Sequence, residues 1–153
     1  MTGAGRRVAL LPWNDSFSVG HRELDAEHHQ MINLINQMCL AADEAKLLPQ
    51  QKQLLRELER AAELHFEHEE AVLEAFYTTM PANRLSLREM LADYKAEHIA
   101  DHRKKLGDLG DIRNMNLRPS AGAGAKLCEE LRAWFIDHAV GYDARIKTIM
   151  QSV

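Results

Sequence analysis

Histidine and carboxylate residues recur in this sequence at spacings that a helix would bring onto one face. The chain has eight histidines among 153 residues. His65 and Glu69 are four residues apart, as are His98 and His102, and residues at this spacing are neighbours on the surface of an α-helix. Imidazole nitrogens together with carboxylate oxygens suit zinc, copper, iron or nickel. The spacing therefore indicates a metal site built on helices.

Two more histidines and an aspartate extend this set. His28 and His138 interrupt apolar helical stripes, and burying an unpaired polar group costs roughly 1–3 kcal/mol. Asp143 follows His138 by five residues, a spacing that diverges by about 140° on a regular helix, so we expect a bend or π-bulge near Gly141. The alternatives are hydrogen-bonded core histidines and a solvated Asp143. Five core histidines in one layer would need more polar partners than the stripes offer, which favours a metal.

The number of candidate ligands restricts the kind of metal site. Seven ligands exceed the four of a structural zinc site and suit two ions that share bridging carboxylates. The zinc-protease pattern HExxH, the Glu-x-x-His pairs of ferritin-like proteins and the haem-attachment pattern CxxCH are absent from the sequence. The candidate ligands are His28, His65, Glu69, His98, His102, His138 and Asp143. We expect the other three histidines, His21, His29 and His68, at the surface.

Four stretches with a helical hydrophobic period must position these ligands. They span about residues 23–44, 49–77, 86–106 and 125–150. Pro49 suits the first turn of a helix, Ser86 and Glu89 form a capping box, and glycines from Gly107 onward predict a loose connection before the last helix. Four amphipathic helices with such connections predict an all-α protein, an up-down-up-down four-helix bundle.

We expect one domain over residues 1–153, with an irregular N-terminal arm at 1–20 and the bundle at 21–153. Hydrophobic residues make up 46% and charged residues 27%, which argues against disorder. The formal charge of -4 lacks the basic excess of nucleic-acid-binding proteins, and no apolar run approaches the ~18–20 residues of a membrane span. The apolar run at 8–11 is too short for a signal peptide. Cys39 and Cys128 form no CxxC, so we expect free packing thiols and a cytoplasmic location.

The order of these residues resembles the hemerythrin family, and in particular its single-domain bacterial branch, the bacteriohemerythrins. The similarity covers nearly the whole chain. The matching segments are WNDSFSVG at 13–20, DAEH at 25–28, HFEHEE at 65–70, HIADH at 98–102 and LRAWFIDH at 131–138, followed by Asp143. Glu27 stands where the family usually has Gln, and Asp101 where it usually has Glu.

This resemblance implies a centre of two non-haem iron ions, bridged by an oxo or hydroxo group, that binds dioxygen reversibly for storage, delivery or scavenging. It implies that the ligands of one iron are His98, His102 and His138, that those of the other are His28 and His65, and that Glu69 and Asp143 bridge the pair. We expect an apolar, water-excluding oxygen pocket lined by Met31, Ile35, Phe66, Trp134 and Val140. We expect no catalytic residue.

Two other functions suit the same site. One is a module that senses oxygen, nitric oxide or iron through a protein partner. The other is a di-iron peroxidase or nitric oxide-reducing enzyme, for which the inner stripes offer no proton donor besides the ligands, Tyr94 and Tyr142. The gap from Glu69 to His98 exceeds the family's usual gap, so we expect the middle two helices to protrude as a hairpin whose residues 78–94 serve a protein partner or a homodimer. The alternative is a longer solvated loop.

Overall fold

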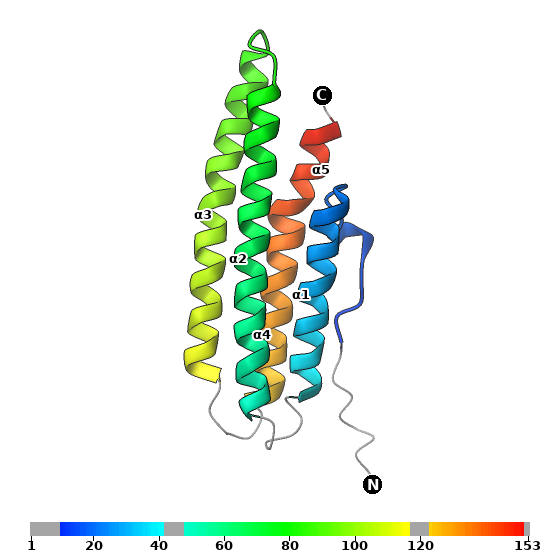
Figure 1. Cartoon of the computed structure of the whole chain (residues 1–153), viewed down its shortest axis with the longest axis vertical. Helices are drawn as coiled ribbons and strands as arrows, with labels where there is room; N and C mark the ends of the chain where they lie inside the picture. Colours follow the sequence, from blue (N-terminus) through cyan, green and yellow to red (C-terminus); the bar gives the residue numbers. More distant parts are fainter. Residues whose placement is uncertain (1–9, 42–47, 117–122, 152–153) are drawn as a thin grey trace.

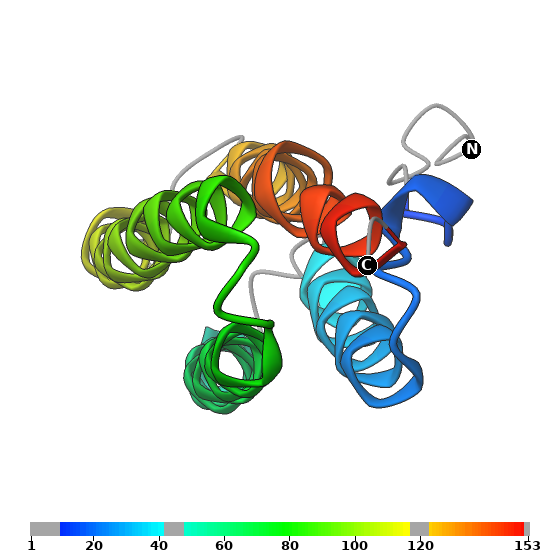
Figure 2. The same cartoon turned by 90° about the horizontal axis from the view of Figure 1, so that it is seen from above.

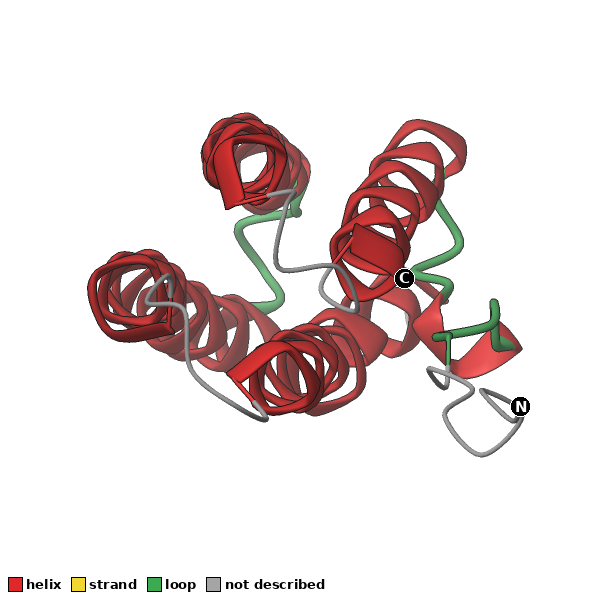
Figure 3. Ribbon diagram, turned by 90° about the horizontal axis from the view of Figure 1, so that it is seen from below, coloured by secondary structure: helices red, strands yellow, loops and turns green. Residues whose placement is uncertain are grey.

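The computed structural model describes residues 10–41, 48–116 and 123–151, and every regular element in these ranges is helical (Figures 1 and 3). The long helices are α1 (Arg22–Ala41), α2 (Leu48–Thr79), α3 (Leu85–Asn116) and α4 (Ala123–His138). A π-helical turn, Ala139–Asp143, continues α4 into the short α5, Ala144–Gln151, and a 3₁₀ turn, Asp15–Phe17, lies in the N-terminal arm. The predicted all-α class is confirmed.

Successive long helices run in opposite directions (Figure 1). α1 and α3 each contact both α2 and α4, and from above the four helices surround a common centre (Figure 2). This is the predicted up-down-up-down four-helix bundle. None of the described helices combines the length and the apolar composition of a membrane span.

Two apolar clusters occupy the bundle, one on each side of a polar layer. On α1, Leu24 belongs to one cluster and Met31 to the other, with His28 between them. On α2, Leu73 belongs to the first cluster and Phe66 to the second, with Glu69 between them. On α3, Leu91 belongs to the first cluster and Leu109 to the second. Along the last helical segment, Ile146 of α5 belongs to the first cluster and Leu131 of α4 to the second. The polar layer is therefore enclosed by hydrocarbon along the bundle axis.

Helix α3 is ten residues longer than its sequence indicates. We expected it to end near Leu106, but it continues through Gly107 and Gly110 to Asn116. Glycine in a helix interior costs about 1 kcal/mol relative to alanine. Leu109 is buried in the core, and Arg113 Nη1 lies 3.0 Å from both carboxylate oxygens of Glu59 on α2. These tertiary contacts outweigh the local preference, so the predicted start of the loose connection is wrong; its remainder at 117–122 lies outside the described residues.

The hairpin formed by α2 and α3 reaches beyond α1 and α5 (Figure 1), as predicted. Its turn lies between Thr79 and Leu85, so Ser86 falls inside the first turn of α3 and not at its N-cap. Met80 is buried in the cluster that contains Ile149. Leu85 and Met90 are 67% and 50% exposed, so only part of the hairpin's apolar surface is available to a partner.

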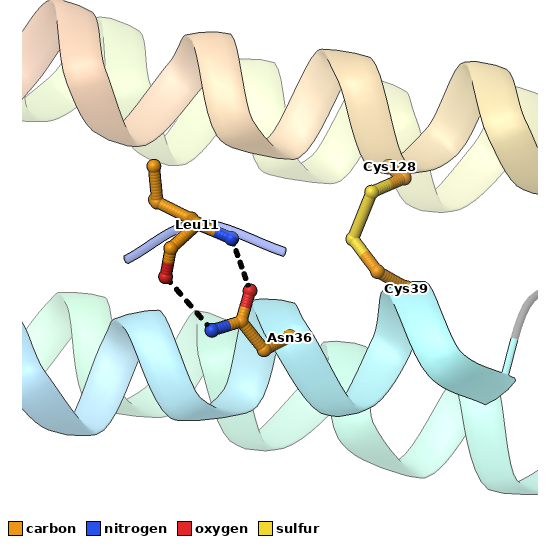
Figure 4. Close-up of a disulfide and its surroundings, with 4 residues drawn as sticks. All are labelled: Leu11, Asn36, Cys39 and Cys128. Carbon is orange, nitrogen blue, oxygen red and sulfur yellow. Dashed lines mark hydrogen bonds between the residues drawn. A yellow bond between two sulfur atoms is a disulfide. The ribbon is translucent and has the colours of Figure 1, made fainter. Parts of the chain in front are cut away.

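A disulfide joins Cys39 at the end of α1 to Cys128 in α4 (Figure 4). The expectation of two free thiols is therefore wrong. The two cysteines are 89 residues apart in the sequence, and the sequence alone does not show whether the fold brings them close enough to form a bridge. The arm is attached close to this crosslink, because Leu11 N donates to Asn36 Oδ1 at 2.7 Å and Asn36 Nδ2 donates to Leu11 O at 2.9 Å. Stable disulfides are rare in the cytosol, so the argument for a cytoplasmic location is lost.

Candidate metal centre

Seven side chains converge in the polar layer between the two apolar clusters, and they come from every long helix and the π-helical turn. They are His28 from α1, His65 and Glu69 from α2, His98 and His102 from α3, His138 from α4 and Asp143 from the π-helical turn. All seven are buried. The structure therefore brings together every ligand candidate identified in the sequence.

Asp143 lies among imidazoles from all four helices. Its Oδ2 is 2.6 Å from His28 Nε2, 2.7 Å from His138 Nε2 and 3.5 Å from His65 Nε2. Its Oδ1 is 3.1 Å from His98 Nε2. One carboxylate thus reaches the imidazoles of both expected metal-binding groups.

Glu69 occupies an equivalent position from α2. Its Oε1 lies 2.6 Å from His65 Nε2, 3.1 Å from His138 Nε2 and 3.7 Å from His102 Nε2, and its Oε2 lies 3.2 Å from His98 Nε2. Two carboxylates that each face both groups of histidines have the placement that a bridging ligand requires.

The π-helical turn explains how His138 and Asp143 share one face of the chain. A π-helix closes its hydrogen bonds between residues i and i+5, so it aligns side chains at the five-residue spacing that a regular α-helix would separate. The predicted bulge near Gly141 is therefore confirmed. The same turn directs Val140 outward, where it is 44% exposed, and the prediction that Val140 lines the oxygen pocket is wrong.

The carboxylates and imidazoles of the metal-free protein strongly shift one another's pKa. Burial alone would raise the pKa of Asp143, but the charge of His138 and the hydrogen bonds with Glu69, His138 and His28 together outweigh burial and hold this pKa well below its usual value. Burial opposes the charged form of His98, yet Asp143 and Glu69 raise its pKa to about 9. His102 differs, because burial dominates and lowers its pKa to about 3.

Among the described residues, His102 Nε2 and Asp143 Oδ1 are buried without a partner in hydrogen-bonding geometry, although Asp143 Oδ1 lies 3.1 Å from His98 Nε2. A buried polar atom left unsatisfied costs roughly 1–3 kcal/mol. Two overlapping groups have ligand atoms that all lie within 4.8 Å of one another. They are His28, His65, Glu69, His138 and Asp143, and Glu69, His98, His102, His138 and Asp143. Metal ions would satisfy the two orphaned atoms, and this nitrogen and oxygen donor set fits iron.

The outward nitrogen, Nδ1, of each of the five imidazoles also has a partner. The distances from Nδ1 are 2.7 Å for His28 to Phe17 O, 2.8 Å for His65 to Glu27 Oε1, 3.1 Å for His98 to the Tyr94 hydroxyl, 3.0 Å for His102 to Glu70 Oε2 and 3.2 Å for His138 to Asp101 Oδ2. Such partners fix the ring orientation and leave Nε2 to bind a metal. None of them was expected from the sequence to orient a ligand histidine, although Tyr94 was named as a candidate proton donor and although Glu70 and Asp101 lie inside the HFEHEE and HIADH segments.

Four of the five residues expected to line the oxygen pocket are buried in one core cluster: Met31, Ile35, Phe66 and Trp134. Phe66 stacks on the His102 ring with centroids 4.2 Å apart and meets His138 edge-on at 4.8 Å. The sequence interpretation missed Phe135, whose buried ring meets His28 edge-on at 5.4 Å. Apolar rings therefore cover the imidazoles on two sides.

The remaining three histidines lie outside the polar layer; one is exposed and two are half-buried. His29 is exposed and stacks on Trp13, whose ring centroid is 3.7 Å away. His21 is half-buried, and its Nδ1 accepts a hydrogen bond from Leu24 N at 3.3 Å, which caps the start of α1. His68 is also half-buried, and its contacts with two glutamates are described below.

A family model, the Hemerythrin HHE cation binding domain, matches residues 19–148. No curated protein and no solved structure matches the chain significantly. The matched range contains all seven clustered side chains and the Nδ1 partners other than Phe17.

Proposed function

This chain belongs to the hemerythrin family, and we propose that it binds dioxygen reversibly at a non-haem di-iron centre. The observation that supports this proposal best is that Glu69 and Asp143 each lie near imidazoles of both histidine groups. Each carboxylate lies within 3.7 Å of imidazoles from both histidine groups, which suits two ions held side by side. The cluster offers seven ligands, and a pair of six-coordinate ions with shared carboxylates would leave room for a small molecule.

Two iron ions would supply electrons and a free coordination position for a diatomic ligand. We propose that His98, His102 and His138 hold one ion, that His28 and His65 hold the other, and that Glu69 and Asp143 bridge them. The chain's own contribution is to aim five Nε2 atoms at one place and to exclude water around them. The rings of Phe66 and Phe135 do the latter, and a dry surrounding shell also adjusts the redox potential of a metal centre.

We propose binding and not turnover as the role of this centre. The sequence offered Tyr94 as a candidate proton donor. Its hydroxyl lies 3.1 Å from His98 Nδ1, and burial together with the charges of Asp143 and Glu69 raises the pKa of Tyr94 above its usual value. A general acid works best with a pKa near the operating pH, so Tyr94 is poorly suited to this task. The side chain of Tyr142 lies outside the described residues.

The proposal is tested by iron analysis combined with visible spectra recorded in air and after deoxygenation. We expect two iron ions per chain and charge-transfer bands in air that disappear on deoxygenation and return on re-aeration. Iron-loaded protein that is colourless in air, or that bleaches irreversibly, would contradict reversible oxygen binding. Repeated turnover of peroxide or nitric oxide would favour the enzyme alternative.

The protruding hairpin is the observation that supports the sensing alternative. Leu85 and Met90 are exposed near its tip, within the 78–94 segment expected to contact a partner or a second copy. Sedimentation of the iron-loaded protein with and without oxygen tests this idea. An oxygen-dependent change of mass would support sensing through assembly, and an unchanged monomer would count against it.

The cytoplasmic location stays a prediction that the disulfide does not favour. A disulfide between Cys39 and Cys128 persists in an oxidising compartment and is rare in a reducing one. Alkylation of thiols in freshly opened cells, followed by mass analysis, distinguishes the two. Protein with both thiols alkylated would support a reducing compartment, and protein with neither alkylated would oppose it.

A further inference from the structure

Glu27 links a buried ligand to a surface histidine. Its Oε1 accepts a hydrogen bond from His65 Nδ1 at 2.8 Å, and its Oε2 accepts one from His68 Nδ1 at 2.9 Å. On the far side of the His68 ring, Nε2 lies 3.4 Å from Glu23 Oε2. Glu23, His68 and Glu27 therefore form a chain of contacts that starts at the surface and ends on the ring of His65.

This chain of contacts concerns one histidine group and not the other. Of the two histidines expected to hold the second iron, His28 bonds the backbone oxygen of Phe17, and only His65 bonds a carboxylate through Nδ1. The carboxylates of Glu70 and Asp101 bond histidines expected at the first iron. A substitution of Glu27 should therefore change the affinity for mainly one of the two ions.

We propose that Glu27 is a positioning residue for His65, and that His68 holds its carboxylate in place. In this role Glu27 fixes the His65 ring with Nε2 toward the centre and makes that nitrogen a stronger donor to the ion shared with His28. The inference rests on the proposed di-metal function. According to this inference, Glu27 and His68 affect one of the two metal sites and not the other.

The geometry accounts for the need for His68. The Glu27 side chain is 29% exposed, and a long side chain with access to water retains several rotamers unless a contact fixes it. His68 bonds the oxygen that His65 leaves free, so both carboxylate oxygens are held and the plane of the carboxylate is set. Outer partners that orient a ligand histidine typically change metal affinity by about 10–100-fold.

Stepwise titration of the metal-free chain with Co²⁺ tests the proposal, because the visible bands of Co²⁺ report each ion as it binds. In Glu27→Ala we expect one of the two binding steps to weaken by about 10–100-fold and the other to stay unchanged. Glu27→Gln retains a hydrogen-bond acceptor without the charge, so its loss should be smaller. Glu67→Gln changes the charge of an exposed residue on α2 and should match the unmodified chain.

A second pair of variants tests the role of His68. Because His68 acts through Glu27, His68→Ala should weaken the same step by a smaller factor, and the double variant should be no weaker than Glu27→Ala alone. Additive effects would contradict the relay. A general loss of packing would weaken both binding steps equally, so equal weakening also overturns the proposal.

The outcomes separate this inference from the proposed function. If the unmodified chain binds two ions and Glu27→Ala titrates identically, the positioning role is wrong and the di-metal centre stands. If the unmodified chain binds fewer than two ions, the di-metal centre and the inference fail together. If two ions bind with the expected effect of Glu27→Ala but the iron form does not take up oxygen, only the oxygen function fails.

Discussion

Asp143 Oδ2 lies 2.7 Å from His138 Nε2 because a π-helical turn, and not a regular α-turn, connects the two residues. The same oxygen lies 2.6 Å from His28 Nε2, a member of the other expected histidine group. One residue of the π-helical turn therefore joins the two histidine groups, and its loss should affect both ions.

We accordingly expect Asp143→Asn to weaken both steps of a metal titration. Loss of an outer partner costs about 10–100-fold in affinity, so loss of a shared ligand should cost at least about 100-fold in each step. Asp93→Asn is a matched control, because Asp93 is exposed on α3 and carries the same charge. Weakening of a single step would show that Asp143 does not bridge.

Metal binding to the metal-free protein should release protons. The pKa values of His65 and His138 are raised well above 6.5 and that of His98 to about 9, since the carboxylates of Glu69 and Asp143 outweigh the opposing effect of burial. The raised pKa values favour the protonated form of these imidazoles at neutral pH, and an imidazole binds a metal only when it is neutral. Titration calorimetry in buffers with different ionisation enthalpies should therefore give buffer-dependent heats at pH 7. Heats that do not depend on the buffer would contradict these protonation states.

The same shifts predict how the stability of the metal-free protein depends on pH. A histidine whose pKa is raised in the folded state stabilises the fold fully below its unfolded value of about 6.5, and this contribution is lost as pH rises through the folded value. For His98, whose folded pKa is about 9, the free energy of unfolding should fall between pH 6.5 and 9. Urea denaturation across this range measures it, and metal-loaded protein should lack the decline. Stability that rises with pH in the metal-free form would show the opposite sign.

Phe66 should contribute far more to stability than Val140, although both were expected to line one pocket. Phe66 is buried and stacks on His102, and truncation of a buried phenylalanine to alanine costs about 3–5 kcal/mol. Val140 is exposed, and surface substitutions usually change stability by about 0.5 kcal/mol or less. Chemical denaturation of Phe66→Ala and Val140→Ala compares them directly. Equal losses would mean that Val140 is packed inside.

The crosslink between Cys39 and Cys128 should stabilise the bundle by limiting the unfolded chain. It closes a loop with a sequence separation of 89 residues, and disulfides typically contribute about 2–4 kcal/mol. We expect the double variant Cys39→Ala with Cys128→Ala to lose that amount in urea denaturation. Thiol titration of the unfolded, unreduced protein should find no free thiol. Two free thiols would show that the crosslink does not form.

The bundle and its ligands could be predicted from the sequence because both depend on local spacing. Residues four apart, such as His65 and Glu69 or His98 and His102, share one face of a helix wherever that helix lies in the fold. The contacts that join distant segments could not be predicted. Helix α3 continues past Gly107 because Arg113 reaches Glu59 on α2, and the Cys39–Cys128 pair has no local signal.

The outer partners of the ligands escaped prediction for the same reason. Glu27 on α1 meets His65 on α2, and Asp101 on α3 meets His138 on α4. Each such pair depends on how two helices are rotated against each other, and this rotation is set by the packing of the whole core. Val140 was misplaced because the spacing indicated a bulge near Gly141 without fixing which neighbouring side chain it turns outward.

The central claim, reversible oxygen binding by a paired-iron centre, is tested most directly by an oxygen titration of the iron-loaded, reduced protein through repeated cycles of oxygen addition and removal. We predict uptake of one dioxygen molecule for each pair of iron ions, and release of the same amount in every cycle. No uptake, or uptake that consumes oxygen without returning it, would contradict this function.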